Sequence, residues 1–485
     1  MTGKLSNLQP KRVFEIFEEL CAIPHGSGDL DAISDYCVEF ARERNLAAKK
    51  DEFKNVVITK PASKGYEDHD GVILQGHLDM VCEKTKESLH DFKTDGLSVY
   101  VEDGFVKAKD TTLGGDDCIA VAIALAVLED DTLEHPPLTA VFTVDEEVGM
   151  LGAVAMDMSD LSGKYLLNID NEEEGVFLTS CAGGIRVDVV IPAPKVSVSD
   201  VAECEIVIDG LAGGHSGTEI HRGKANAHKV FGRLLHMLND KVRYSVSELH
   251  GGAMDNAIAC FLQAKVLVEK EDIELLCDIA GKLEGELKTE YRGVDDNIRI
   301  TVTKTQGMGT AMMTPKAKEI LTFFLMNCPN GVIKMSADID GLVETSLNCG
   351  ILEYDEANEE IHVGFAIRSS IESAKMAVYN QIEYLAQFLG CECESSGNYP
   401  GWQYQKESGL RTLFEELYQE QTGKKAEFTA VHAGLECGVF AGRMPELDII
   451  SYGPDILDIH TVLERLSVES VARTYELTLN ALKRL

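Results

Sequence analysis

The sequence predicts an α/β protein that is split by an inserted α+β domain. The chain has 485 residues, a length that favours two or three domains over one. Short β-type runs alternate with helical runs up to about residue 185, the pattern then changes, and the alternation returns beyond residue 400. Such alternation is typical of an α/β domain. We therefore predict an α/β domain formed by residues 1–185 and 395–485, interrupted by an inserted domain of residues 186–394.

The elements of the α/β domain follow from the spacing of apolar residues. Helical spacing between about residues 10 and 46 predicts two helices at the start of the chain. Strands are predicted at residues 55–59, 71–75, 138–144 and 164–169, with a helix at 118–128. After residue 400 we expect helices at 409–422 and 468–482 and a strand at 447–451.

The inserted domain shows the same succession of elements twice. The first set has strands at 186–192, 203–209 and 259–268 and helices at 223–238 and 272–287. The second set begins with a strand at 297–303, continues with a helix at 315–325 and strands at 332–340, 344–354 and 361–367, and ends with a helix at 373–389. The two sets share a pattern but no residues, which predicts an α+β domain of two similar halves.

Charge and hydropathy exclude several classes of partner. The chain has 45 Lys plus Arg against 81 Asp plus Glu, a net charge of −36. A field of that sign repels nucleic acid and anionic lipid alike. No apolar run reaches the ~18 residues that a membrane span needs, and the start of the chain has no apolar signal region. Thirteen cysteines, with only one close pair, fit neither a disulfide framework nor a zinc ribbon. We expect a cytoplasmic protein.

Acids and histidines follow the ends of several predicted strands. In open α/β sheets ligands bind beyond the carboxyl ends of the strands, so these side chains are expected to meet in one crevice. An acid pair also opens the helix at 118–128. The residues concerned are His77 and Asp79, Asp116 and Asp117, Asp145, Glu146 and Glu147, Asp170, and His460.

Their joint occurrence favours a metal centre. A single strand-end histidine is usually an ordinary polar residue, and an acid at a helix start can be a simple N-cap. Several carboxylates in one crevice are costly, however, unless cations neutralise them. Imidazole and carboxylate ligands suit zinc, cobalt or manganese. Two metals ~3.5–4 Å apart would need one bridging carboxylate.

Two local spacings indicate roles around such a centre. His77 and Asp79 are two residues apart and share a face of an extended segment, so Asp79 can orient the imidazole. Glu146 and Glu147 are adjacent and point to opposite sides. One of them can bind metal while the other is free to act as a general base.

A set of ordered motifs carries a family resemblance. They are GHLDM, LGGDD, DEEVGMLGA, NIDNEE, GGHSGTEIHRGKANA and DIHT. Together they resemble the two-zinc peptidase and amidohydrolase clan of aminoacylases, carboxypeptidase G-type enzymes and tripeptidases, and above all its aminoacyl-histidine (Xaa-His, carnosinase-like) dipeptidases. The resemblance spans the whole chain.

The resemblance implies a fold, an activity and a ligand set. The fold would be a zinc-peptidase-like catalytic domain with a mixed central sheet flanked by helices, and the insertion would be its lid. The activity would be hydrolysis of unblocked dipeptides, preferably of the Xaa-His type. The cofactors would be two divalent metal ions, zinc foremost. One metal would be held by His77, Asp116 and Asp170, and the other by Asp116, Glu147 and His460.

Further roles rest on the same resemblance. Glu146 would be the general base that activates a metal-bridging water, and Asp79 would orient His77. The bond between Asp116 and the following residue would be cis. In the lid, His215 would steady the oxyanion and Arg368 would bind the substrate carboxylate. A homodimer through the lid is also implied, which leaves open whether His215 serves its own chain or a partner.

Other hypotheses fit the residues less well. An N-acyl amino acid deacylase of the same clan stays open, as does a non-catalytic binding protein that keeps the fold. A serine hydrolase is disfavoured because the GGHSGT segment fails the G-x-S-x-G register. A two-carboxylate glycosidase leaves His77 and His460 without a role. His432 and Glu436, in a Gly-bearing segment, lie either near the pocket or in a turn.

Overall fold

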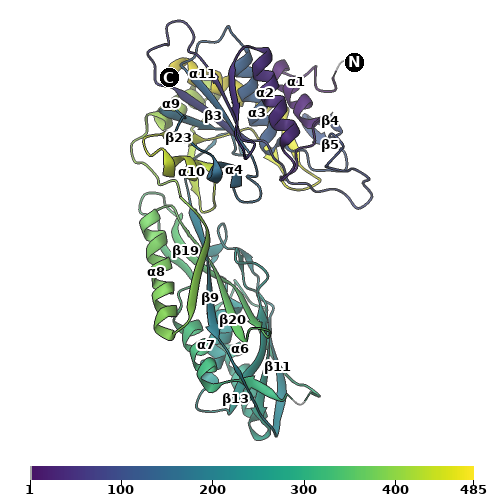
Figure 1. The fold of residues 1–485 in the computed structure, drawn as a ribbon, viewed down its shortest axis with the longest axis vertical. Helices are drawn as coiled ribbons and strands as arrows, with labels where there is room; N and C mark the ends of the chain where they lie inside the picture. The colour runs from purple at the N-terminus through teal and green to yellow at the C-terminus, as the bar shows by residue number, and fades with distance from the viewer. Residues whose placement is uncertain (1–2, 308) are drawn as a thin grey trace. The chain divides into compact units, whose positions relative to one another are not determined.

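The computed structural model describes residues 3–307 and 309–485, which form two compact units. Unit 1 comprises Met1–Cys181, Trp402–Ala430 and Leu435–Leu485, and unit 2 comprises Ala182–Gly401 and Val431–Gly434. Each unit has a large buried apolar core of its own. The colour gradient of Figure 1 shows that segments from both ends of the chain build unit 1.

Unit 1 is organised around a mixed sheet, which in the described part of the chain has eight strands. Strands β6, β3, β7 and β23 run parallel to one another at its centre, and β1, β2 and β8 pair in antiparallel fashion toward the edges. In sheet order the strands are β1 (Ala47–Lys50), β2 (Val56–Lys60), β6 (Leu138–Thr143), β3 (Val72–His77), β7 (Tyr165–Asn168), β23 (Asp448–Ser451), β8 (Val176–Cys181) and β22 (Glu427–Val431).

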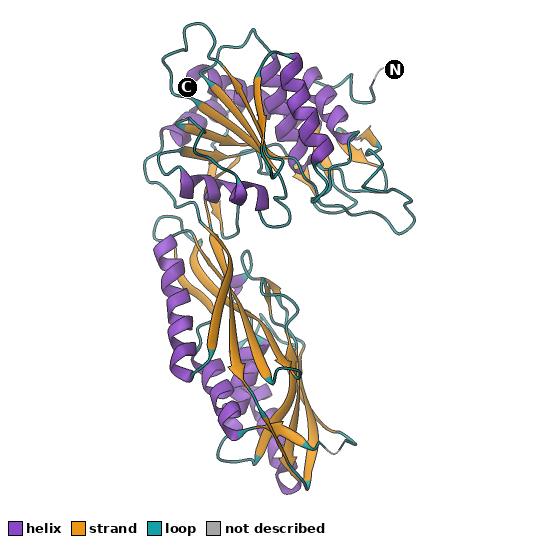
Figure 2. Ribbon diagram, viewed as in Figure 1, coloured by secondary structure: helices purple, strands orange, loops and turns teal. Residues whose placement is uncertain are grey.

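Helices pack against this sheet, as Figure 2 shows. The central helix α3 (Gly115–Glu129) is apolar on all sides and is buried from its first residue to Leu128, because it lies between β3 and α1. The other helices of unit 1 are α1 (Lys11–Cys21), α2 (Asp31–Glu43), α4 (Leu151–Ala155), α9 (Gly409–Thr422), α10 (Glu436–Arg443) and α11 (Val468–Arg484).

A second, small sheet in unit 1 carries the loop that contains His460. Its strand order is β24 (Ile456–Leu457), β25 (Arg465–Ser467), β5 (Phe105–Ala108) and β4 (Val99–Glu102). Strands β24 and β25 are antiparallel, so residues 458–464 form the connection of a hairpin. None of the helices in the described ranges combines the length and apolar character that a membrane crossing needs.

Unit 2 is built on one long antiparallel sheet, with nine strands among its described residues. In sheet order these are β16 (Arg299–Lys304), β11 (Val201–Asp209), β15 (Leu262–Glu269), β13 (Tyr244–Gly251), β19 (Val343–Asp355), β20 (Glu360–Ser369), β9 (Gly183–Pro192) and β21 (Glu392–Tyr399), with β18 (Gly331–Met335) on β19. The covering helices are α5 (Ala227–Leu238), α6 (Ile273–Glu290), α7 (Pro315–Asn327) and α8 (Glu372–Leu389). Short pairs β10 (Lys195–Ser197) with β17 (Ala311–Met313), and β12 (Gly214–His215) with β14 (Ala257–Ile258), complete the unit.

The sheet order corrects the expected arrangement of the two halves. Strand β16, predicted to open the second half, pairs with β11 and closes the first. Each half is a β-α-β-β-α-β unit with the same order, fourth-first-third-second strand: β16-β11-β15-β13 and β21-β9-β20-β19. The first half is therefore inserted into the second, between β9 and α7. Local periodicity could not show this nesting, because it depends on the distant pairing of β9 with β20.

Candidate active site

The carboxyl ends of the parallel strands gather the predicted residues in unit 1. His77 is the last residue of β3 and is in register with Thr143, the last residue of β6, whereas β7 ends at Asn168 opposite Gln75. The acids Glu146 and Glu147 come three and four residues after the end of β6. Asp170 follows β7, Asp116 lies in the first turn of α3, and His460 lies in the β24–β25 hairpin loop.

One cluster consists of His77, Asp116 and Asp170. The Nε2 atom of His77 lies 3.1 Å from Asp116 Oδ1 and 3.6 Å from Asp170 Oδ1. The other ring nitrogen, Nδ1, donates to the backbone carbonyl of Asp79 at 3.0 Å. With its proton on Nδ1, the neutral ring turns the lone pair of Nε2 toward two carboxylates.

A second cluster consists of Asp116, Glu147 and His460. His460 Nε2 lies 3.1 Å from Asp116 Oδ2 and 3.0 Å from Glu147 Oε1. In each cluster one potential ligand atom per residue lies within 4.8 Å of the others. Asp116 thus presents Oδ1 to the first cluster and Oδ2 to the second, which is the geometry of a bridging carboxylate.

The donor atoms fit divalent metal ions. Each cluster offers one imidazole nitrogen and two carboxylate oxygens, a set that suits zinc, cobalt or manganese. Without a cation, the carboxylates draw protons onto the rings. The hydrogen bonds to Asp116 and Glu147 raise the pKa of His460 to about 10. Burial opposes a charged His77, yet its hydrogen bonds to Asp116, Asp170 and Asp79 raise its pKa well above the usual value. Both clusters are therefore stabilised by a positive charge, which either a proton on the imidazole or a bound cation can supply.

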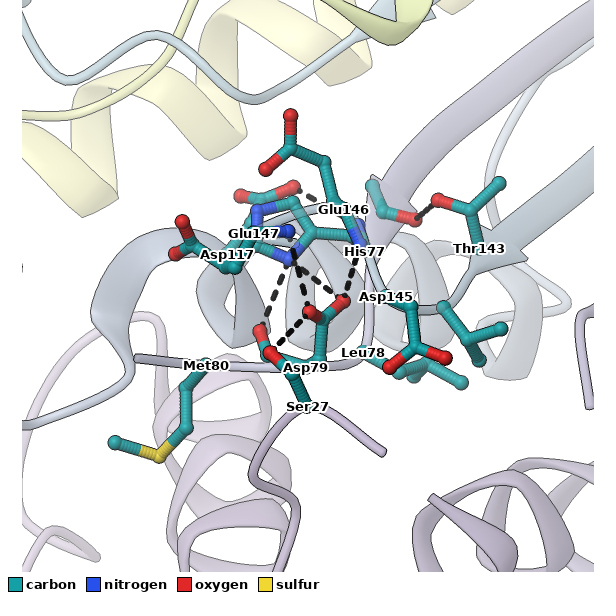
Figure 3. A network of polar contacts seen from close by, with 12 residues as sticks. Ser27, His77, Leu78, Asp79, Met80, Asp117, Thr143, Asp145, Glu146 and Glu147 are labelled. Atoms are coloured by element: carbon teal, nitrogen blue, oxygen red, sulfur yellow. Dashed lines mark hydrogen bonds and ion pairs between the residues drawn. The ribbon is translucent and has the colours of Figure 1, made fainter. Parts of the chain in front are cut away.

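The Asp79 carboxylate forms hydrogen bonds with two surrounding loops (Figure 3). This fully buried carboxylate accepts hydrogen bonds from the backbone N–H of Glu146 at 2.9 Å and of Glu147 at 3.3 Å, and from Ser27 Oγ at 2.8 Å. Burial opposes its charge, but interaction with His77 and these hydrogen bonds lower its pKa. Asp79 thus contacts the imidazole through its backbone carbonyl and both glutamates through its carboxylate, while its orienting role stays a prediction.

The two glutamates face different surroundings. They lie on a turn whose first residue, Asp145, has φ 54° and accepts from the Gly28 N–H at 2.6 Å. The carboxylate of Glu147 faces His460, whereas that of Glu146 makes no hydrogen bond within the described residues. Burial, together with the charges of Asp170 and other nearby acids, raises the pKa of Glu146 well above its usual value. Burial thus favours the protonated form of the Glu146 carboxyl group.

Close packing of α3 on β3 supports the first cluster. The carboxylate of Asp117 accepts from the His77 backbone N–H at 3.3 Å. A Cβ at Gly76 would lie 2.6 Å from Asp117 Oδ2 and 2.8 Å from Ala120 Cβ, so only glycine allows this approach. The peptide bond between Asp116 and Asp117 is cis, as the resemblance implied.

His432 and Glu436 have separate surroundings. Glu436 is fully buried at the start of α10 and accepts from Gln75 Nε2 and Thr143 Oγ1, both at 2.5 Å. Burial raises its pKa to about 8. It thus lies beneath the ends of β3 and β6 and not in a surface turn. His432 belongs to unit 2, where Nε2 lies 2.7 Å from Ser346 Oγ.

His215 and Arg368 are neighbours within unit 2. His215 Nδ1 accepts from the Thr218 N–H at 3.2 Å, so the neutral ring carries its proton on Nε2. Burial and then the charge of Arg368 lower the pKa of His215, and the same causes lower that of His432 to about 3. The Nε atom of Arg368 is buried without a hydrogen-bond partner in the described part of the chain. This guanidinium therefore has a donor to spare for an anion.

Three supporting residues escaped the motif analysis: Ser27, Asp117 in its contact with His77, and Glu464. Glu464 is buried and accepts from backbone N–H groups next to Asp116. Nothing in the sequence distinguishes it from the other acids of a chain with 81 Asp plus Glu. The only available signal was its place four residues after His460.

A mixed α/β sheet with two adjoining histidine–carboxylate clusters that share an aspartate is typical of a metal-dependent hydrolase as a class. Residues 73–484 match the model of peptidase family M20/M25/M40, and the chain belongs to this family. It is a hydrolase that acts on peptide bonds.

Relatives match over the whole chain. The cytosol non-specific dipeptidase of Escherichia coli K12 is 36% identical over 482 residues, 99% of either chain. The crystal structure of aminoacylhistidine dipeptidase from Vibrio alginolyticus matches with a TM-score of 0.93 and 33% identity, covering 100% of this chain and 98% of that one. Aminopeptidase PepT from Bacillus cereus shares the fold, with a TM-score of 0.57 and 15% identity over 98% of each chain. The predicted fold class is confirmed.

Proposed function

We propose that this chain is a cytoplasmic di-metal dipeptidase that hydrolyses unblocked dipeptides and prefers those with C-terminal histidine. The observation that carries the proposal is the pair of clusters that share Asp116, each with one imidazole nitrogen and two carboxylate oxygens. The names of the E. coli and Vibrio relatives support the substrate class, and that of the former also supports the compartment.

The metal ions would be two zinc ions, held by the clusters in the way the sequence predicts. His77, Asp116 and Asp170 would hold one ion, and Asp116, Glu147 and His460 the other. When bound, the metals would supply Lewis acidity at the peptide carbonyl and neutralise the buried carboxylates. Cobalt and manganese suit the same donor atoms, so the preference for zinc is part of the proposal.

Glu146 would be the general base. Its carboxylate is free of hydrogen bonds within the described residues, and its raised pKa suits an exchangeable proton. It would take a proton from the attacking water as the water oxygen bonds to the peptide carbon. It would return that proton to the nitrogen as the C–N bond breaks, so that a neutral amine leaves. Asp79 would hold Glu146 and His77 in place through its hydrogen bonds.

Two residues of unit 2 would act on the substrate. The Nε2–H of His215 would donate to the oxygen that gains charge in the tetrahedral intermediate, because Nδ1 already accepts from Thr218. Arg368 would bind the C-terminal carboxylate of the dipeptide, which is supported by its unpartnered Nε. A homodimer through residues 186–394 stays a prediction.

The test is hydrolysis of a small panel by protein reconstituted with Zn²⁺, with the bound metal measured by elemental analysis. The panel contains His-ended dipeptides, other dipeptides, a tripeptide and an N-acetyl amino acid. We expect about two zinc ions per chain and the highest kcat/KM for His-ended dipeptides. Preferred cleavage of the N-acetyl amino acid would instead identify a deacylase, and equal rates on all dipeptides would remove the histidine preference.

A further inference from the structure

Two segments of unit 1 position Asp116 and His460 of the second cluster, and one buried carboxylate joins these segments. The first loop, residues 113–115, leads directly into Asp116. The second, residues 458–464, connects β24 to β25 and contains His460. Glu464 ends the second loop and is 4% exposed, whereas the residues before it in that loop are exposed or half-buried.

The Glu464 carboxylate binds three consecutive backbone N–H groups of the first loop. Oε2 accepts from Leu113 at 2.8 Å and from Gly114 at 3.2 Å, and Oε1 accepts from Gly115 at 2.8 Å. Gly114 has φ 67°, a left-handed conformation that helps successive N–H groups converge on one anion. A Cβ at Gly115 would lie 3.3 Å from Glu464 Oε1, so the contact is close.

The same residue anchors the loop that carries His460. The Glu464 N–H donates to the Thr461 carbonyl at 3.1 Å, which closes a turn between the two residues. An ion pair between Asp458 and Arg465 joins the two ends of the loop. His460 itself has φ 60°, and its side chain is 45% exposed, against 1% for His77. His460 therefore depends on its own loop for its position.

We propose that Glu464 is a positioning residue that ties the Asp116 loop to the His460 loop and thereby sets the metal affinity of the Asp116–Glu147–His460 cluster. The inference rests on the proposed metal-dependent function. A side chain that accepts from three consecutive N–H groups of the first loop, and whose own N–H closes a turn of the second, holds the two loops at a fixed separation. Supporting residues of this kind change metal affinity by ~10–100-fold when they are replaced.

The test is a Zn²⁺ titration of metal-free protein against a competing chelating dye, for wild type and Glu464→Gln. The amide keeps the size of the side chain but has one acceptor oxygen, and its NH₂ group would face an N–H of the first loop. We expect the dissociation constant of one of the two zinc ions to rise ~10–100-fold, with a smaller change for the other ion. Saturating Zn²⁺ should restore kcat to within a few fold of wild type.

The matched control is Glu469→Gln, whose side chain on α11 is 87% exposed and ion-paired with Arg473. It should titrate like wild type. If Glu464→Gln fails to fold, Glu464→Asp decides, because it keeps the charge but is one methylene too short to reach all three N–H groups. Wild-type affinity for both zinc ions in a folded variant would overturn the inference. An equal loss of affinity for both zinc ions, together with a loss of thermal stability, would also overturn the inference, because it would show a general effect on the fold.

The zinc titration uses no peptide, so it distinguishes a failure of the proposed dipeptidase function from a failure of the proposed role of Glu464. A wild-type protein that binds two zinc ions but cleaves no dipeptide would contradict the proposed function and leave the role of Glu464 standing. A wild-type protein that cleaves dipeptides while Glu464→Gln binds zinc normally would contradict the role of Glu464 alone.

Discussion

Asp116 is the residue on which both clusters depend. Its two carboxylate oxygens lie 3.1 Å from His77 Nε2 and from His460 Nε2 respectively. Burial alone would raise its pKa, but hydrogen bonds with His460 and His77 take the pKa well below its ordinary value. A carboxylate that stays charged at this depth is suited to bridge two cations. Its neighbour Asp117 differs, because burial and the charge of Asp170 raise its pKa well above the usual value.

The role of Glu146 leads to a prediction at this scale. Glu146→Gln keeps the size of the side chain and the backbone N–H that binds Asp79. The variant should keep its fold and metal content but lose ~10²–10⁴ in kcat, the usual contribution of a general base. Steady-state kinetics on one dipeptide, together with elemental analysis, check this. Near-normal turnover would remove Glu146 from the role.

His215 and Arg368 are distinguished by when they would act. A donor to the developing oxyanion serves the transition state, so His215→Ala should lower kcat by ~10²–10³ with KM changed only a few fold. Arg368 would bind a carboxylate already present in the substrate, so Arg368→Ala should raise KM and lose the preference for a dipeptide over its C-terminal amide. Kinetics of both variants on that acid and amide pair are the measurement. An unchanged kcat in the first, or an unchanged preference in the second, would contradict the corresponding role.

At the scale of elements, the two halves of unit 2 meet through their sheet and through the packing of α5 against α7. Strands β13 and β19 pair through only two registered positions, His250 with Glu353 and Gly251 with Leu352. The N-terminus of α5 adds to this pairing, because Asn226 Nδ2 donates to the Cys349 carbonyl at 2.8 Å. His228 Nδ1 reaches the same carbonyl at 3.2 Å. The halves are thus held together by helix packing and polar side chains as well as by the sheet.

His228 makes this junction sensitive to pH. Its side chain is fully buried, and burial lowers its pKa to about 4 from the ordinary 6.5. Between these values the unfolded chain binds a proton that the native chain does not. The neutral His228 therefore makes its full contribution to the free energy of unfolding above pH 6.5. This contribution falls as the pH drops toward 4, by about 2 kcal/mol between pH 7 and pH 5.

Urea unfolding at pH 7 and pH 5 checks this for wild type and His228→Gln. The variant should be less stable at pH 7 but should lose about 2 kcal/mol less than wild type on acidification. His432, whose pKa is also lowered, is present in both chains and cancels in the comparison. An equal loss in the two proteins would show that His228 does not carry the effect.

At the scale of the whole molecule, the proposed metal ligands all belong to unit 1. They come from segments as distant as residues 77 and 460, and both segments fold into that unit. Unit 2 has its own core and its own sheet. Metal binding should therefore stabilise one unit selectively.

Scanning calorimetry of the metal-loaded protein, with and without a chelator, tests this selectivity. A ligand that binds only the native state stabilises it by about 2.7 kcal/mol at 100 times its dissociation constant. Chelation also leaves the carboxylates of the two clusters without a neutralising cation. We expect the transition of unit 1 to shift to lower temperature and that of unit 2 to stay in place. Equal shifts, or none, would contradict the assignment of the ligands.

The sequence by itself determined the α/β class, the ligand types and most of the elements. The helices and strands of unit 1 that hold His77, Asp116 and Asp170 lie close to their predicted ranges, because apolar periodicity is a local property of the chain. Several strands were not predicted, among them β1, β8 and β22 of unit 1 and β13 and β21 of unit 2. Strand β21 is polar and exposed along much of its length, which leaves no alternating pattern to detect.

Only the tertiary structure decided the nesting of the two halves and the contacts that support the site. The pairing of β9 with β20 joins segments about 170 residues apart, and Glu464 meets Gly115 across 349 residues. Such contacts depend on where distant segments are brought in space, and periodicity within a short window carries no information about that. The proposed role of an isolated acid such as Glu464 follows from the three N–H groups that donate to it in the folded chain.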